Sequence, residues 1–107
     1  MRPPCLTNVQ ITSLHETLPD WQVSDNKKSL LIALRFANFQ QAFSFMTEIA
    51  EAAEAADHHP DWRNSNRLVT IRLTTHDVGG LTSLDVDLAN QISQAAKRYQ
   101  AKIEAYC

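Results

Sequence analysis

Apolar residues recur at every third or fourth position between Phe39 and Asp57, which is the spacing of one face of an α-helix. The segment is also rich in alanine and glutamate, both of which favour helix. Pro60 disfavours helical geometry in the residue before it, so we expect the helix to end at or just before His58-His59. The predicted buried stripe consists of Phe39, Ala42, Phe43, Met46, Ile49, Ala50 and Ala53.

A second long helix is expected to begin near Thr82. The segment 82–85 (Thr-Ser-Leu-Asp) resembles a capping box, and Gly79-Gly80 breaks the chain just before it. The apolar stripe predicted for this helix continues almost to the end of the chain and comprises Leu84, Leu88, Ile92, Ala95, Tyr99 and Ile103. A shorter helix is expected near the N-terminus, through Val9, Ile11 and Leu14.

Two stretches alternate between their two faces in the manner of half-buried β-strands. The stretch 67–75 places three β-branched or aliphatic residues on one face: Val69, Ile71 and Leu73. The stretch 29–36 alternates in the same way. A short extended piece at 21–23 is separated from it by the turn-forming Asp25-Asn26, so we expect these two segments to pair as a hairpin.

These elements predict one α+β domain spanning residues 1–107: a four-stranded antiparallel sheet with helices packed on one face, in the order α-β-β-α-β-β-α. A chain of 107 residues is enough for one domain and too short for two. Its apolar fraction of 44% and charged fraction of 21% are those of an ordinary globular protein.

The charge pattern argues against several classes of partner. The formal net charge is -2 and the isoelectric point is about 6.0, with scattered lysines and arginines, so we expect no direct nucleic-acid binding. No apolar run approaches the roughly 20 residues of a membrane span, and the chain start lacks a secretory signal, so we expect a cytoplasmic protein without a membrane partner. Cys5 and Cys107 lack CxxC spacing and are expected to be free thiols.

Three of the four histidines, His58, His59 and His76, flank the predicted strand at 67–75. Imidazole titrates near neutral pH, so a cluster of histidines is suited to giving a proton to a leaving group and accepting one from a donor atom. A position at the C-terminal end of a helix favours the protonated form of the ring. The fourth histidine, His15, has no such companions in the sequence.

Two other interpretations of these histidines remain open on composition and spacing alone. A His-His-Pro run is compatible with a plain helix stop, in which the imidazoles bond the last carbonyls of the helix. Three imidazoles also suit Zn²⁺, although adjacent His58 and His59 rarely point at one ion and no HExxH or Cys/His spacing supports such a site. We therefore expect no metal.

The spacing of these residues resembles a known family. Glu54-x-x-x-His58-His59-Pro60, then His76 sixteen residues after the proline and Asp85 nine residues later, is similar to the signature of the pterin-4a-carbinolamine dehydratases. The segments 75–82 (Thr-His-Asp-Val-Gly-Gly-Leu-Thr) and 42–46 (Ala-Phe-Ser-Phe-Met) resemble two further blocks of that family. The resemblance extends from about Leu14 to near the C-terminus, and several spaced elements matching in order make it specific.

The chain departs from the family pattern at one position. The family usually has a tyrosine or tryptophan six residues after the proline, where this chain has Asn66. If the aromatic residue serves packing, its loss is tolerable. If it shapes the pterin site, its loss affects substrate affinity.

The resemblance implies a hydro-lyase that expels water from a 4a-hydroxytetrahydropterin, leaving a quinonoid dihydropterin, without a cofactor. This reaction recycles tetrahydrobiopterin after aromatic amino-acid hydroxylation. His58 and His76 are the implied acid and base, in either order, and His59 is implied to bind or orient the ring. The residues expected to contact substrate are Glu54, Pro60, Thr75, Asp77, Val78, Asp85 and Trp21.

Several of these residues also have a purely structural explanation. Glu54 lies one helical turn before His58 and could share that face and orient an imidazole, or be a solvated helix carboxylate. Asp85 could serve the site or cap a helix, and Trp21 could line the site or lie in the core. Backbone groups of the segment 75–78 could hydrogen-bond a pterin edge.

The family also forms homo-oligomers, so a homodimer or homotetramer is expected, and the alanine-rich face of the helix at 39–57 would suit close association. Its animal members additionally act as a dimerisation cofactor of a transcription factor. A non-catalytic interaction or assembly module on the same fold is therefore the alternative function.

Overall fold

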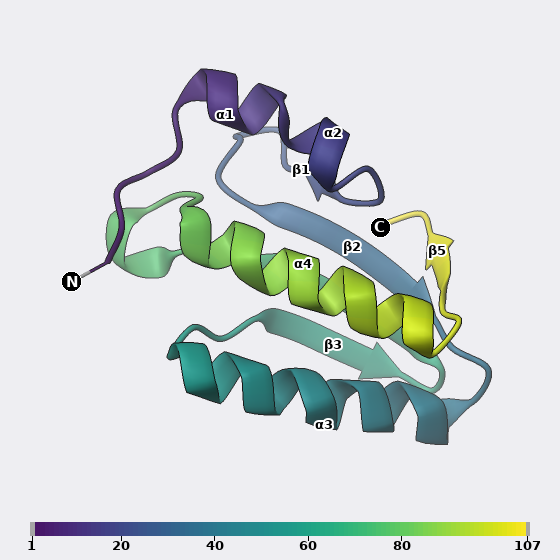
Figure 1. The fold of residues 1–107 in the computed structure, drawn as a ribbon. Helices are drawn as coiled ribbons and strands as arrows, with labels where there is room; N and C mark the ends of the chain where they lie inside the picture. The colour runs from purple at the N-terminus through teal and green to yellow at the C-terminus, as the bar shows by residue number, and fades with distance from the viewer. Residues whose placement is uncertain (1, 107) are drawn as a thin grey trace.

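The computed structural model describes residues 2–106 and shows one layer of helices on an antiparallel sheet (Figure 1). Ten short or long elements follow one another along the described residues. These are α1 (Asn8–Thr12), α2 (Leu14–Thr17), β1 (Gln22–Val23), β2 (Leu30–Arg35), α3 (Phe39–Ala56), β3 (Asp61–Ser65), β4 (Leu68–Leu73), the 3-10 turn η1 (His76–Val78), α4 (Ser83–Arg98) and β5 (Lys102–Glu104).

The sheet has five strands, one more than the sequence predicted. Its order is β1-β2-β4-β3, with β5 also paired to β2, and all pairings are antiparallel. The expected hairpin between β1 and β2 is confirmed, with Val23 opposite Leu30. The expected strand at 67–75 is β4, whose register places Ile71 opposite Ile32 of β2.

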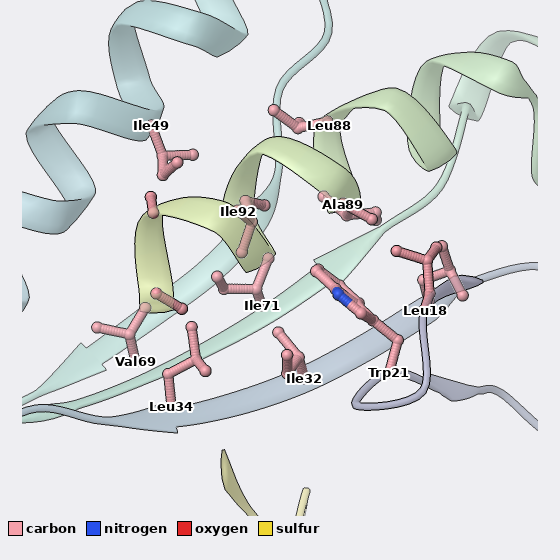
Figure 2. Close-up of a cluster of buried hydrophobic side chains, with 14 of the residues drawn as sticks. Leu18, Trp21, Ile32, Leu34, Ile49, Val69, Ile71, Leu88, Ala89 and Ile92 are labelled. Atoms are coloured by element: carbon pink, nitrogen blue, oxygen red, sulfur yellow. The ribbon is translucent and has the colours of Figure 1, made fainter. Parts of the chain in front are cut away.

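Helices α3 and α4 lie side by side over one face of the sheet (Figure 1). Figure 2 shows Ile49 of α3 and Ile92 of α4 directed at the side chains of β2 and β4. The alternation predicted for β4 is confirmed, because Val69, Ile71 and Leu73 are fully buried whereas Arg72 is exposed on the other face. The α+β class and the placement of the helices follow from this one apolar face.

The face that α3 buries differs from the prediction. Phe45 is fully buried, with its ring centroid 4.8 Å from that of Phe36, whereas Phe39 and Phe43 are 51% and 55% exposed. The buried stripe is instead Ala42, Phe45, Ile49 and Ala53. The predicted and observed stripes share Ala42, Ile49 and Ala53, and the helix presents Phe45 rather than Phe43 to the core, where it contacts Phe36.

The second long helix ends earlier than predicted. It stops at Arg98, and Gln100 adopts a left-handed φ of 57°, so that the Ala101 N–H bonds the Ala96 carbonyl at 2.9 Å. Ile103 is therefore no part of the helix. It lies in β5 opposite Leu34 and is 45% exposed.

The sequence predicted four strands but located only three of them. The fourth is β3, which forms a hairpin with β4. Residues 61–65 (Asp-Trp-Arg-Asn-Ser) are mostly polar and lie at the sheet edge, so the strand carries little hydrophobic pattern. Asn66 occupies the turn with a left-handed φ of 55°, a conformation that asparagine tolerates better than an aromatic residue does. The Asn64 side chain donates to the Asn66 and Leu68 carbonyls and holds the turn closed.

Candidate active site

The end of α3 fixes the backbone of the histidine pair, as the sequence predicted. Asp57 takes a left-handed φ of 50° and its N–H bonds the carbonyls of Ala53 and Glu54, while the His58 N–H bonds Ala53 at 3.0 Å. These bonds satisfy the last carbonyls of the helix. Pro60 then leads directly into β3.

His58 is buried against Asp85. The His58 side chain is 5% exposed, and its Nε2 lies 2.6 Å from Asp85 Oδ1. A carboxylate can only accept, so Nε2 carries the proton. The other carboxylate oxygen accepts from the Thr75 hydroxyl at 2.8 Å and from the Thr82 N–H at 2.9 Å. Asp85 therefore both caps α4 and holds His58, and its expected contact with substrate stays a prediction.

His59 points away from this interior pair. Its side chain is 55% exposed, and Nε2 donates to Glu54 Oε1 at 2.5 Å. Glu54 was expected to orient an imidazole or to be solvated. The chain leaves the helix at Asp57 and turns His58 inward, so the imidazole that Glu54 bonds is that of His59.

His76 begins the η1 turn after β4. Its side chain is 67% exposed, and Nε2 donates to Asp61 Oδ2 at 3.1 Å. Arg72 also donates to this carboxylate oxygen, at 3.3 Å. Asp61 was missed by sequence reasoning, and the only signal for it is its position directly after the His-His-Pro run. A cleft of about 200 Å³ adjoins this pair and is lined by Asp61, Trp62, Arg63, Thr70, Arg72 and Tyr106.

Arg2 links the two histidine-bearing segments. Its Nε donates to Asp77 Oδ2 at 3.0 Å and its Nη2 donates to the Asp57 carbonyl at 2.9 Å. Asp57 precedes the His58-His59 pair and Asp77 follows His76. No sequence pattern predicts this bridge, since Arg2 is separated from Asp57 and Asp77 by 55 and 75 positions.

The turn after β4 leaves two backbone donors free. The Thr75 N–H donates to the Gly80 carbonyl, and the Thr75 carbonyl accepts the N–H groups of Val78 and Gly79. Cys5 Sγ lies 3.5 Å from the Val78 carbonyl. Thr75 is also 1% exposed, so its backbone does not offer the pterin contact that the sequence suggested. Within residues 2–106, the N–H groups of His76 and Asp77 make no hydrogen bond.

Two residues singled out from the sequence lie away from the histidines. Trp21 is 7% exposed in the hydrophobic core beside Leu18 (Figure 2), and its Nε1 donates to Ser93 Oγ at 2.8 Å. Ser93 follows Asp85 by more than two turns of α4, about 12 Å along the axis. Trp21 is thus a core residue. Asn66 lies at the far end of the β3–β4 hairpin from Pro60.

The described residues contain no group of three or more histidine, cysteine or acidic side chains placed to hold a metal ion. Cys5 is a free thiol, and Cys107 lies outside the described residues. Among residues 2–106, no helix has the length and apolar character needed to span a membrane.

The fold and the site together define a small α+β protein in which His58, His59 and His76 each bond a carboxylate. Residues 4–95 match the family model described as pterin 4 alpha carbinolamine dehydratase, so the chain belongs to that family. The resemblance recognised in the sequence is thereby confirmed.

Relatives from bacteria support this assignment. A Prochlorococcus marinus protein is 47% identical over 93 residues, which cover 87% of this chain and 95% of that protein. An Afipia carboxidovorans protein is 46% identical over 82 residues, covering 77% and 82% of the two chains. Both carry the name "Putative pterin-4-alpha-carbinolamine dehydratase".

Two solved structures share the fold. A transcriptional coactivator/pterin dehydratase from Brucella melitensis superposes with a TM-score of 0.83 at 34% identity, covering 86% of this chain and 98% of that one. A pterin dehydratase-like protein, identified as a RuBisCO assembly factor in the alpha-carboxysome, superposes with a TM-score of 0.62 at 18% identity, covering 71% and 88%. The second likeness concerns the fold alone.

Proposed function

We propose that this protein is a cytoplasmic hydro-lyase that eliminates water from a 4a-hydroxytetrahydropterin, giving a quinonoid dihydropterin in tetrahydrobiopterin recycling. One observation carries the mechanism. His59 and His76 are exposed imidazoles whose Nε2 atoms are held by Glu54 and Asp61, and their Nδ1 atoms have no hydrogen-bond partner among the described residues. Each ring thus keeps one nitrogen for proton transfer.

The elimination needs two proton transfers. One imidazolium protonates the C4a hydroxyl as the C–O bond breaks and water leaves, while a neutral imidazole accepts the N5 proton. The electron pair of the N5–H bond then forms the C4a=N5 double bond. A carboxylate partner stabilises the imidazolium and fixes the ring orientation, and each positioned acid or base contributes about 10²–10⁴-fold.

The burial of His58 changes the roles that the sequence suggested. With 5% of its side chain exposed and Nε2 bonded to Asp85, His58 is poorly placed to touch a bicyclic substrate. We therefore assign the acid and base to His59 and His76, in an order that the geometry leaves open. His58 becomes a positioning residue that anchors the end of α3 against α4.

The surroundings of His76 offer groups for substrate binding. The free N–H groups of His76 and Asp77 can donate to the carbonyl or ring nitrogens of a pterin. The adjoining cleft of about 200 Å³ is lined by the exposed face of the sheet that carries Asp61, Arg63 and Arg72, so a bound ring would meet polar groups there.

A dehydratase assay on matched histidine variants tests this proposal. We expect His59→Ala and His76→Ala each to lose about 10²-fold or more of kcat/KM, with an unchanged free energy of unfolding. The matched control is His15→Ala, because His15 is an exposed histidine on α2 that bonds only the Thr12 carbonyl. Wild-type activity in His59→Ala or His76→Ala, or no activity in the wild type, would contradict the proposal.

A second candidate function is a non-catalytic interaction or assembly module. The exposed Phe39 and Phe43 on α3, whose tilted rings have centroids 5.8 Å apart, favour protein contact over solvent. The same pair supports our expectation of a homodimer or homotetramer. Light scattering on wild type and on Phe43→Asp tests assembly: a smaller particle for the variant supports it, and equal masses oppose it.

A further inference from the structure

A second cleft lies at the other end of the sheet from the histidines. Its volume is about 300 Å³, and three of its lining residues are the cations Arg35, Arg67 and Lys102. Arg67 precedes β4, whereas His76 follows it, so the length of that strand separates this cleft from the candidate active site.

The cleft carries positive charge that the protein does not neutralise. No acidic residue lines it. Arg35 is paired with Glu104 at 3.2 Å, but the side chains of Arg67 and Lys102 form no hydrogen bond or ion pair with any described residue. Two like charges facing one cleft, in a chain of net charge -2, favour an anion between them.

The backbone beneath these cations is fixed. The Arg67 carbonyl accepts the Phe36 N–H at 2.8 Å, and Lys102 lies opposite Arg35 in the β2–β5 pairing. The C-terminal end of α4 also borders the cleft, and its negative end would oppose an anion. However, N–H groups of Tyr99, Gln100 and Ala101 bond the carbonyls of the last turn, which reduces that opposition.

Tyr99 gives the cleft an apolar wall with a polar tip. Its half-buried ring packs edge-on against Phe36 and Phe45, with centroid distances of 6.2 Å in both cases. Its hydroxyl has no hydrogen-bond partner among residues 2–106. The cleft volume is at the lower end of the range for small organic ligands, about 300–1,000 Å³, and exceeds the needs of an inorganic ion.

We propose that this cleft binds a small organic phosphate monoester. The dianionic phosphate group lies between Arg67 and Lys102, whose two charges it matches, and the organic part packs on Tyr99. Guanidinium forks bind phosphate through paired hydrogen bonds, and the tyrosine hydroxyl adds a further donor. This site is independent of the proposed dehydratase activity.

Titration of the folded protein with phenyl phosphate at low ionic strength, followed by amide chemical shifts, tests this proposal. We expect saturable shifts at Ala37, Arg67, Gln100 and Lys102, weaker binding of inorganic phosphate, and no binding of phenol. The double variant Arg67→Gln/Lys102→Gln should bind about tenfold or more weakly, which is about 1.4 kcal/mol.

The matched control is Lys27→Gln/Lys28→Gln, which removes two exposed cations from the β1–β2 loop, outside this cleft. It should bind phenyl phosphate as the wild type does. The absence of saturable shifts in wild type, or equal weakening in both double variants, would overturn the proposal. Either result can be obtained whether or not the protein dehydrates a pterin.

Discussion

His58 and Asp85 form a buried pair, with 2.6 Å between Nε2 and Oδ1, that joins the end of α3 to the start of α4. The second oxygen of Asp85 bonds Thr75 and Thr82, so this carboxylate links three segments of the chain. The exposed His59 and His76 lie at the ends of two of these segments. The buried His58–Asp85 pair therefore sets the positions of these two exposed histidines without facing solvent itself.

Asp85→Asn should destabilise the protein strongly, because it removes one partner of a buried charge-assisted pair. We expect a loss of about 3–5 kcal/mol in the free energy of unfolding, measured by urea denaturation. Glu54→Gln, which alters the exposed His59 pair, should cost less than about 1 kcal/mol. Equal losses for the two variants would contradict the structural role assigned to Asp85.

The buried face of α3 can be tested with two phenylalanines. Phe45→Ala leaves a cavity against Phe36 and Tyr99 and should cost about 3–5 kcal/mol. Phe43→Ala, at a position 55% exposed, should change the free energy of unfolding of the monomer by about 0.5 kcal/mol or less. A larger loss of unfolding free energy for Phe43→Ala than for Phe45→Ala would mean that α3 presents a different face to the sheet.

Arg2→Gln should loosen the η1 turn that carries His76, because it breaks the bridge between Asp57 and Asp77. We expect faster hydrogen exchange at the amides of Val78 and Gly79, which bond Thr75. The global free energy of unfolding should change by less than about 1 kcal/mol. Exchange in the β4 amides serves as the internal control, and unchanged rates in the turn would contradict the bridging role of Arg2.

The exposed pair of Glu48 and Arg98 predicts a pH-dependent contribution to stability. The hydrogen bond from Arg98 holds the pKa of the Glu48 carboxyl below its usual value. A lowered folded-state pKa gives stability that is present above the unfolded pKa and is lost as the pH falls through the folded pKa. Wild type should therefore melt slightly above Glu48→Gln at pH 7, and the difference should vanish in acid.

Glu51→Gln is the control for this pair, because Glu51 lies on the same helix and its side chain forms no hydrogen bond or ion pair with the described residues. Its melting temperature should follow that of the wild type at both pH values. A difference between wild type and Glu48→Gln that persists in acid would point to a cause other than ionisation of Glu48.

Local signals were sufficient for much of the fold. Pro60 correctly predicted the end of α3, and the capping box at Thr82 correctly predicted the start of α4. These signals depend on backbone geometry within a few residues, so they survive folding unchanged. The strand β3 gave no such signal, because an edge strand has one partner and can carry polar residues on its exposed positions.

The composition of the candidate site was predictable, but its pairing was not. The sequence identified the three histidines, Glu54 and Asp85, and it placed Glu54 beside His58 by helical spacing. That spacing applies only while the helix continues, and the left-handed Asp57 ends it, so Glu54 bonds His59 instead. The partners Asp61 and Arg2 were missed because no periodicity relates them to the histidines.

The sequence by itself determined where the helices begin, which strand face is apolar, and which family signature the histidines match, since all of these depend on the order of neighbouring residues. Only the tertiary structure decided that His58 is buried, that His59 and His76 stay accessible, and that α3 buries Phe45 rather than Phe43. Those outcomes depend on how whole elements pack around one core. Packing joins residues such as His58 and Asp85 that are distant along the chain.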